Sequence, residues 1–164
     1  MKKFLFIFLI AFLIFIIIAL HFIDKRYFLC PIDYKKEIVI RNDDKGAGDF
    51  GALRAGGRRH KGIDLHAQIG TEVRAVRFAQ VTEVGFRERL GNYVELSHPG
   101  NLVTIHGHLH RILVRAGQWV AQGKIIGYVG KTGNAKHPMI LPHLHFEIRR
   151  DNIPINPLEW LEDR

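Results

Sequence analysis

The chain has only one cysteine, and no glycine precedes Gly46. The single cysteine, Cys30, excludes an internal disulfide, which is compatible with an oxidising compartment but does not establish one. All 16 glycines lie at or after Gly46, so the composition changes there from a segment without glycine turns to one rich in them. At 164 residues there is room for one domain and an appendage, and the glycine distribution predicts that the domain begins near Gly46.

The region after Gly46 also lacks a good amphipathic helix. Its apolar residues are β-branched or alternate with polar ones in short runs separated by glycine, which is the pattern of strands. These runs cover residues 72–76, 79–86, 93–98, 102–106, 125–129 and 143–149. Roughly 115 residues can bury one core, so we predict an all-β fold, an antiparallel two-sheet β-sandwich with a groove between its loops.

A basic helix and a stacking aromatic motif are missing too, which argues against nucleic acid as a partner. The formal net charge is nevertheless +8, and the region from Phe50 onward has 16 Lys and Arg against 10 Asp and Glu. This excess of positive charge suits an anionic partner, and it is equally compatible with a merely solvated surface.

Residues 4–23 contain no charged side chain, and 17 of them are Phe, Leu or Ile. Each such side chain favours the centre of a membrane by roughly 0.3 to 0.6 kcal/mol. Twenty residues of helix span about 30 Å, the thickness of a hydrocarbon core. We therefore predict a membrane anchor over residues 1–23, made of a short cytoplasmic N-terminus and a transmembrane helix. A stalk over residues 24–45 and a domain over residues 46–164 follow, and residues 37–41 of the stalk are expected to form a short strand against the domain.

Two other interpretations of the N-terminus fit less well. A cleaved signal peptide also begins with lysines, here Lys2 and Lys3, but this apolar run exceeds the usual ~7 to 15 residues. No small-x-small cleavage triplet follows it. Attachment of a lipid to Cys30 would need small residues before the cysteine, where the chain has Phe28 and Leu29.

Residues with metal-binding chemistry gather in two short segments. In the second, a strand would present His143, His145 and Glu147 on one face and the intervening apolar residues on the other. In the first, a glycine disfavours helix, and His60 and Asp64 share a face of an extended chain because they are four residues apart. Zinc favours imidazole and carboxylate ligands, and a catalytic zinc keeps three protein ligands with water in the fourth position. Either motif alone is weak evidence, because histidines are often plain surface residues.

From about Phe50 to Trp160 the sequence resembles the lysostaphin-type (LytM-like) zinc endopeptidases, which cut peptidoglycan cross-links. The resemblance includes the H-x-x-x-D and H-L-H-F-E motifs above and extends to several others in the same order and spacing. These are GTEVRA (residues 70–75), GNYV (91–94), TIHGHL (104–109), GQWVAQGKIIG (117–127), GKTG (130–133) and NPL (156–158). The implied fold is a two-sheet β-sandwich of the duplicated-hybrid-motif kind.

The resemblance implies that His60, Asp64 and His145 bind one zinc ion per chain and that His108 and His143 are the catalytic pair. Two neutral imidazoles and one carboxylate would leave a net charge of about +1, so zinc could lower the pKa of its bound water toward ~7 and make that water a nucleophile. His143 would lie near that water because it shares a strand face with His145, and it could act as a base or as a donor to the oxyanion.

The sequence departs from the family pattern in two places. His106 stands where the family commonly has tyrosine, and we expect it to be structural. Residues 134–142, before the H-L-H motif, form a longer and more apolar link than is common, and we expect them to border the cleft. The remaining histidines are expected to be surface, turn or outer-sphere residues: His66, His98, His110 and His137.

The resemblance implies a metalloendopeptidase with peptidoglycan as its partner. Because such an enzyme must face the cell wall, we expect a single-pass protein of the inner (cytoplasmic) membrane with its domain on the periplasmic or wall side. A D-alanyl-diaminopimelate cross-link and a glycine bridge are both open as the bond cut. The sequence does not identify a regulatory protein partner.

Two alternatives come from other classes of protein, and a third is a related enzyme. A non-catalytic relative that binds the wall or activates another hydrolase would typically have a damaged ligand set, whereas all five expected positions are filled here. A biotinyl or lipoyl carrier domain would use Lys124, but it would leave the histidines unexplained. A zinc D-Ala-D-Ala carboxypeptidase would separate the first histidine and the aspartate by more than three residues.

Overall fold

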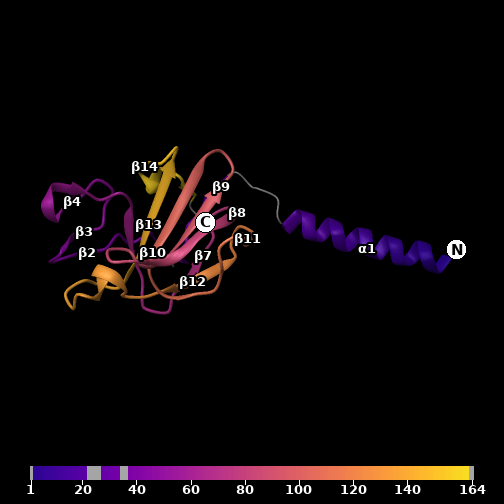
Figure 1. Cartoon of the computed structure of the whole chain (residues 1–164), viewed down its shortest axis with the longest axis horizontal. Helices are drawn as coiled ribbons and strands as arrows, with labels where there is room; N and C mark the ends of the chain where they lie inside the picture. The colour runs from indigo at the N-terminus through magenta and orange to yellow at the C-terminus, as the bar shows by residue number, and fades with distance from the viewer. Residues whose placement is uncertain (1, 22–26, 34–36, 163–164) are drawn as a thin grey trace.

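The computed structural model describes residues 2–21, 27–33 and 37–162. Figure 1 shows a long N-terminal helix followed by a domain made mainly of strands. The helical elements are α1 (Lys2–His21) and the short 3₁₀ helices η1 (Ala55–Gly57), η2 (Gly133–Lys136) and η3 (Pro157–Glu159). The strands are β1 (Phe28–Leu29), β2 (Asn42–Asp43), β3 (Gly46–Ala47), β4 (Leu53–Arg54), β5 (Arg58–Arg59), β6 (Ile63–His66), β7 (Glu72–Arg74), β8 (Ala79–Arg87), β9 (Gly91–His98), β10 (Leu102–Ile112), β11 (Trp119–Val120), β12 (Ile125–Val129), β13 (His143–Arg150), β14 (Ile153–Ile155) and β15 (Leu161–Glu162).

Nine of these strands form one sheet, with the long β10 at its centre. The first half of β10 pairs with β9 on one side and β13 on the other, and its second half pairs with β12. All pairs within this sheet are antiparallel, which confirms the predicted all-β, antiparallel architecture. The prediction of two separate sheets differs from the structure, because hydrogen bonding continues through β10 from one part of the domain to the other.

The strand predicted at residues 102–106 is longer in the structure and continues to Ile112. The pairing of β10 with β9 shifts in register between His106 and Leu109, and His108 has a positive φ of 61°. A bulge of this kind lets a strand continue past residues that interrupt its alternation. The alternation that predicted this strand therefore stops at His106, where the bulge begins.

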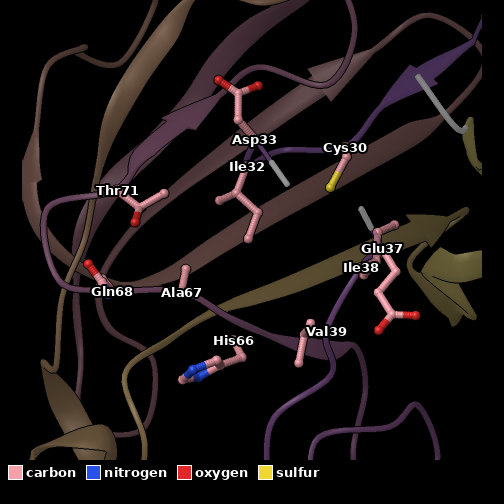
Figure 2. Close-up of a pocket in the computed structure, with 10 residues that line it drawn as sticks. All are labelled: Cys30, Ile32, Asp33, Glu37, Ile38, Val39, His66, Ala67, Gln68 and Thr71. Carbon is pink, nitrogen blue, oxygen red and sulfur yellow. The ribbon is translucent and has the colours of Figure 1, made fainter. Parts of the chain in front are cut away.

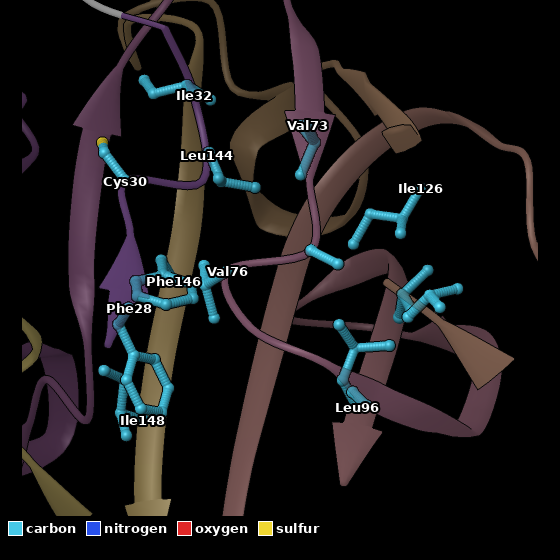
Figure 3. Close-up of a cluster of buried hydrophobic side chains, with 14 of the residues drawn as sticks. Phe28, Cys30, Ile32, Val73, Val76, Leu96, Ile126, Leu144, Phe146 and Ile148 are labelled. Carbon is cyan, nitrogen blue, oxygen red and sulfur yellow. The ribbon is translucent and has the colours of Figure 1, made fainter. Parts of the chain in front are cut away.

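The hydrophobic core lies against one face of β13. Leu144, Phe146 and Ile148 are fully buried there, as their alternation with polar residues predicts. They belong to a cluster that also contains Val73 and Leu96 from other strands (Figure 3). Because this packing fixes β13, it also fixes the positions of the polar side chains on the opposite face of the strand.

The segment predicted as a stalk contributes to the same core. Phe28 and Cys30 are each 1% exposed, and Ile32 is 6% exposed. β1 pairs in parallel with β15 near the other end of the chain, and Ile40 forms a bridge with Leu65 of β6. Residues 28–32 and 38–41 are therefore packed on the domain, and burial of the Cys30 side chain argues further against lipid attachment there.

A small pocket of about 340 Å³ borders this N-terminal segment (Figure 2). Its lining residues come from residues 30–33 and 37–39 and from β6 and the turn that follows it: Cys30, Ile32, Asp33, Glu37, Ile38, Val39, His66, Ala67, Gln68 and Thr71. The pocket lies apart from the proposed zinc ligands and the catalytic pair, none of which lines it.

Helix α1 coincides with most of the apolar run predicted to cross a membrane, and its described large apolar side chains from Phe4 to Ile18 are exposed. Within the described residues, no helix meets both the length and the hydropathy that a membrane crossing requires. The predicted span, residues 4–23, ends beyond this helix, and its last two residues lie outside the described residues.

Candidate metal centre

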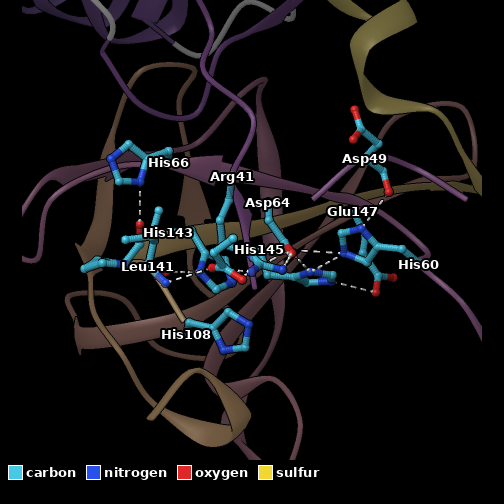
Figure 4. A network of polar contacts seen from close by, with 12 residues as sticks. Arg41, Asp49, His60, Asp64, His66, His108, Leu141, His143, His145 and Glu147 are labelled. Atoms are coloured by element: carbon cyan, nitrogen blue, oxygen red, sulfur yellow. Dashed lines mark hydrogen bonds and ion pairs between the residues drawn. The ribbon is translucent and has the colours of Figure 1, made fainter. Parts of the chain in front are cut away.

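The two predicted half-sites lie side by side on neighbouring strands. β6 and β13 are antiparallel, and their register places Asp64 directly opposite His145. His60 precedes β6 and turns its ring toward the same point, with its centroid 4.9 Å from that of His145 (Figure 4). One potential ligand atom from each of His60, Asp64 and His145 lies within 4.8 Å of the others.

The three ligand atoms fit a metal ion. His60 Nε2 is 3.0 Å from His145 Nδ1, and Asp64 Oδ1 is 3.1 Å and 2.9 Å from these two nitrogens. Tetrahedral zinc with bonds of about 2.0 to 2.1 Å would need ligand atoms roughly 3.3 Å apart, so a small expansion of this triangle would accommodate the ion. All three side chains are buried, which gives the donor set the protection from water that a tight site needs.

Hydrogen bonds on the far side of the rings determine which nitrogens face the cluster. His60 Nδ1 donates to the backbone carbonyl of Asp49 at 2.9 Å, which leaves Nε2 for a metal. His145 Nε2 lies 3.0 Å from Glu147 Oε1, which leaves Nδ1. Glu147 is in turn held by Arg149 through two hydrogen bonds. Carboxylate and carbonyl partners of this kind orient metal-binding imidazoles.

The charges within the cluster are strongly coupled. Burial alone would raise the pKa of Asp64, but hydrogen bonds from His145 and His60 hold it well below its usual value. Burial alone would lower the pKa of His145, but its contacts with Asp64 and Glu147 raise it to about 9. Without a metal, His145 is therefore protonated on both ring nitrogens at neutral pH. A bound metal would have to displace one of these two protons.

His108 and His143, the predicted catalytic pair, lie beside this cluster. Their ring centroids are 4.7 Å apart, and that of His108 is 5.8 Å from His145. His143 Nδ1 donates to the carbonyl of Leu141 at 2.7 Å, and His108 Nδ1 donates to the carbonyl of Thr132 at 3.0 Å. A carbonyl can only accept, so each neutral ring carries its proton on Nδ1 and has a free lone pair on Nε2.

Both histidines of the pair are neutral at physiological pH. Burial is the main reason that the pKa of His143 falls to about 4. Burial and the neighbouring His143 and His145 hold the pKa of His108 well below its usual value. The positive φ of His108 is also unusual for a residue other than glycine, and such strain tends to persist at functional positions.

These groups open into a cleft of about 1080 Å³. All five predicted site residues line it, and Asn134 and Ile140 border it, as expected for the link before the H-L-H motif. Its lining includes nine Lys and Arg side chains but only three carboxylates. The cations are Arg41, Lys45, Arg54, Arg58, Arg59, Lys61, Arg87, Arg89 and Arg149, and the carboxylates are Asp64, Glu88 and Glu147.

Sequence reasoning missed the groups that surround the cluster. Arg41 and Arg54 bind the second oxygen of Asp64, and Glu147 holds His145. Of these three residues, only Glu147 could have been found from the sequence, because alternation places it on the same strand face as His145.

His66, His110 and His137 are exposed, as expected, and lie outside the three-residue cluster and the lining of the cleft. The expectation is wrong for His98, which is buried at the end of β9 and hydrogen-bonded to the carbonyl of Phe78 and to Thr104 Oγ1.

His106 points away from the cleft into the core, as expected for a structural residue. It is fully buried, with its ring centroid 5.2 Å from that of Phe146. Neither ring nitrogen makes a hydrogen bond of normal geometry with a described residue. Burial, together with the nearby His98, lowers the pKa of His106 to about 3.

Replacing His106 with phenylalanine is expected to flatten the pH dependence of stability. The pKa of His106 is about 3 in the folded state, against 6.5 for an ordinary histidine. Between these two pH values the unfolded state binds more protons than the folded state, so stability decreases as the pH is lowered. At pH 5 this group costs the unmodified chain about 2 kcal/mol of unfolding free energy, a loss that His106→Phe would not share. Urea unfolding at pH 7 and pH 5 measures this difference, and equal losses in both proteins would contradict it.

Residues 58–157 match peptidase family M23. A curated relative, the peptidoglycan DD-endopeptidase ShyC of Vibrio cholerae, is 32% identical over 133 residues, which are 81% of this chain and 29% of that protein. The chain spans well under two thirds of the length of such curated relatives.

Two solved structures have similar folds. A zinc-containing peptidase from Vibrio cholerae matches with a TM-score of 0.63 and 31% identity, over 79% of this chain and 39% of that one. The catalytic domain of the antimicrobial peptidase lysostaphin from Staphylococcus simulans matches with a TM-score of 0.62 and 29% identity, over 70% of this chain and 90% of that one.

Proposed function

Because this chain belongs to peptidase family M23, we propose that it is a zinc metalloendopeptidase that hydrolyses peptide cross-links of bacterial peptidoglycan. The observation that carries the proposal is the buried triad of His60, Asp64 and His145 beside His108 and His143 in one open cleft. The similarity to a relative named as a peptidoglycan DD-endopeptidase supports the substrate class.

His60 Nε2, Asp64 Oδ1 and His145 Nδ1 would hold the zinc ion, since these are the atoms that face one another. Bound there, zinc would polarise the scissile carbonyl and lower the pKa of the attacking water. The hydrogen bonds that the two rings donate to the Asp49 carbonyl and the Glu147 carboxylate keep both imidazoles turned toward the ion, so their orientation does not need to change on binding.

His108 and His143 are suited to move the proton. In the tautomer that the structure gives them, Nε2 is a base and not a donor, so either ring can accept the proton of the attacking water. The same nitrogen can then return that proton to the leaving amine. Neither ring could donate to an oxyanion before it is protonated, which favours the acid and base roles for this pair.

The charge of the cleft supports a substrate that carries carboxylates. Nine cationic side chains against three carboxylates line it, and four of the nine are used internally: Arg41 and Arg54 on Asp64, Arg149 on Glu147 and Arg87 on Glu83. The remaining cations would attract the acidic stem peptides of peptidoglycan. The D-alanyl-diaminopimelate linkage, which lies beside a free carboxylate, suits this cleft better than an uncharged glycine bridge.

The proposal is tested by incubating the full chain, solubilised in detergent, with purified sacculi of several wall types. Mass spectrometry should show uncrosslinked muropeptides that disappear when a zinc chelator is added and return with zinc. Binding to sacculi without any hydrolysis would instead support the alternative, a non-catalytic wall-binding protein or activator of another hydrolase. The complete ligand and catalytic set argues against that alternative.

We also propose that residues 1–23 anchor the protein in the inner membrane with the domain facing the periplasm or wall. The support is the apolar sequence of residues 4–23 and the wall-directed chemistry proposed above. The protein should fractionate with membranes and resist extraction by salt or alkali, and protease outside spheroplasts should digest the domain. Ile14→Asp combined with Phe15→Asp should release it, since each Asp costs about 2.5 to 3.5 kcal/mol at a helix centre. An intact domain after protease treatment would contradict the proposed orientation.

A further inference from the structure

Arg41, from the segment before the domain boundary expected from the sequence, is buried at the edge of the metal centre. It is 3% exposed, and its guanidinium contacts Asp64 Oδ2 through Nη2 at 3.0 Å and Nε at 3.3 Å. Arg54 contacts the same oxygen through Nη2 at 2.8 Å. Both arginines precede residues 58–157, the stretch that the family model matches.

The two oxygens of Asp64 therefore have different partners. Oδ1 faces the histidines of the proposed zinc site, whereas Oδ2 accepts three N–H groups from Arg41 and Arg54. An oxygen that already accepts three charge-assisted hydrogen bonds is a poor additional metal ligand. The arrangement restricts Asp64 to binding a metal through one oxygen, which leaves room in the coordination sphere for water or substrate.

Arg41 also connects the metal centre to the loop that orients a catalytic histidine. Its Nη1 binds Asp43 Oδ2 at 2.6 Å, and the same Asp43 oxygen accepts the backbone N–H of Leu141 at 2.9 Å. The carbonyl of Leu141 is the group that accepts His143 Nδ1–H. One continuous set of hydrogen bonds thus runs from Asp64 through Arg41, Asp43 and Leu141 to His143. Figure 4 shows its two ends, Arg41 beside Asp64 and Leu141 beside His143.

The backbone holds this segment firmly in place. Arg41 N–H donates to the carbonyl of Asp64 at 2.8 Å, and the carbonyl of Arg41 accepts from Gly48 at 2.7 Å. Gly48 in turn accepts from the N–H of Asp64. A Cβ at position 48 would lie 2.8 Å from both the Arg41 carbonyl oxygen and Asp64 Cβ, so only glycine permits this close approach.

We propose that Arg41 and Asp43 are positioning residues, which hold Asp64 in one-oxygen ligation and fix the loop that orients His143. The inference rests on the proposed zinc site. Groups that orient metal ligands from the outer sphere typically change metal affinity or activity by about 10- to 100-fold when altered. The segment at residues 38–43 is thus part of the active site and not a passive connection.

The test uses the full chain in detergent, stripped of metal, with zinc alone as the probe. Arg41→Lys keeps the positive charge but loses the fork that binds two groups at once, and it should weaken zinc binding by about 10- to 100-fold in competition with a chromophoric chelator. Arg74→Lys is the matched control, because Arg74 also pairs with a carboxylate but does not line the cleft, and its zinc affinity should be unchanged. The cobalt-substituted Arg41→Lys protein should also show altered visible absorption, since Asp64 Oδ2 then loses the two N–H groups of Arg41, keeps only Arg54 as an arginine partner and can move closer to the metal.

Asp43→Ala examines the second part of the network and remains informative if Arg41→Lys does not fold. It removes the acceptor for Leu141 N–H, so kcat should fall by about tenfold with little change in KM. Wild-type zinc affinity in folded Arg41→Lys, or wild-type kcat and zinc affinity in Asp43→Ala, would overturn the inference. Zinc binding without hydrolysis by the unmodified chain would overturn only the proposed function, whereas absence of zinc binding would overturn both.

Discussion

Replacing His143 with alanine, or His108 with asparagine, is expected to lower turnover by about 10²- to 10⁴-fold while leaving the zinc content unchanged. The two rings lie beside the proposed zinc ligands, but their Nδ1 atoms bind backbone carbonyls and their Nε2 atoms are free to accept protons. Their loss should remove proton transfer without removing a ligand. Asparagine is chosen at position 108 because it tolerates the positive φ found there better than alanine does.

The comparison between neighbouring histidines makes this prediction sharp. His143 and His145 are two residues apart on one strand, yet only His145 belongs to the three-residue cluster. Turnover on cross-linked muropeptides and zinc content by mass spectrometry would be measured for each variant. The double variant should be little worse than either single one, since the two rings act as a unit. Loss of zinc from His143→Ala, or a His106→Ala variant as inactive as His108→Asn, would refute the assignment.

Substitution of a proposed ligand should instead remove zinc and activity together. His145→Ala and Asp64→Asn each take one donor from a set of three, so neither should retain stoichiometric zinc after dialysis. At a zinc concentration about 1000 times the Kd, binding stabilises the unmodified fold by about 4 kcal/mol, a gain that these variants should lack. Asparagine keeps the shape of Asp64, so that Arg41 does not face an empty space.

Thermal melts with and without added zinc provide the measurement. The unmodified chain should melt at a higher temperature with zinc, whereas the melting temperatures of His145→Ala and Asp64→Asn should not respond. His66→Ala is the control, because His66 is an exposed histidine at the end of β6 that does not belong to the cluster. Full zinc occupancy in both ligand variants would exclude this site as the metal centre.

Much of the site could be predicted from the sequence because its two halves depend on local alternation. Leu144 and Phe146 must enter the core, so the period of the strand places His143 and His145 on the other face, whatever the rest of the fold. The same reasoning cannot place His108, whose position depends on a bulge and a positive φ that alternation does not encode.

Long-range packing explains the remaining differences. The burial of Phe28 and Cys30 depends on pairing between β1 and β15, which come from opposite ends of the chain. Arg41 resembled any charged residue in a polar segment, and its role became visible only when the fold brought it onto Asp64. A boundary inferred from glycine content marks where turns begin, and it does not mark where packing begins.

The early start of the core at β1 limits how far the domain can lie from its proposed anchor. Seven peptide units connect His21, the end of α1, to Phe28, the start of β1, and even a fully stretched chain spans only about 3.6 Å per residue, or roughly 25 Å in all. A freely moving stalk over residues 24–45, as predicted from the sequence, would have let the domain lie much farther from the membrane. With residues 1–23 anchored as proposed, β1 would stay within roughly 25 Å of the end of α1, so the near side of the domain would remain close to the lipid headgroups.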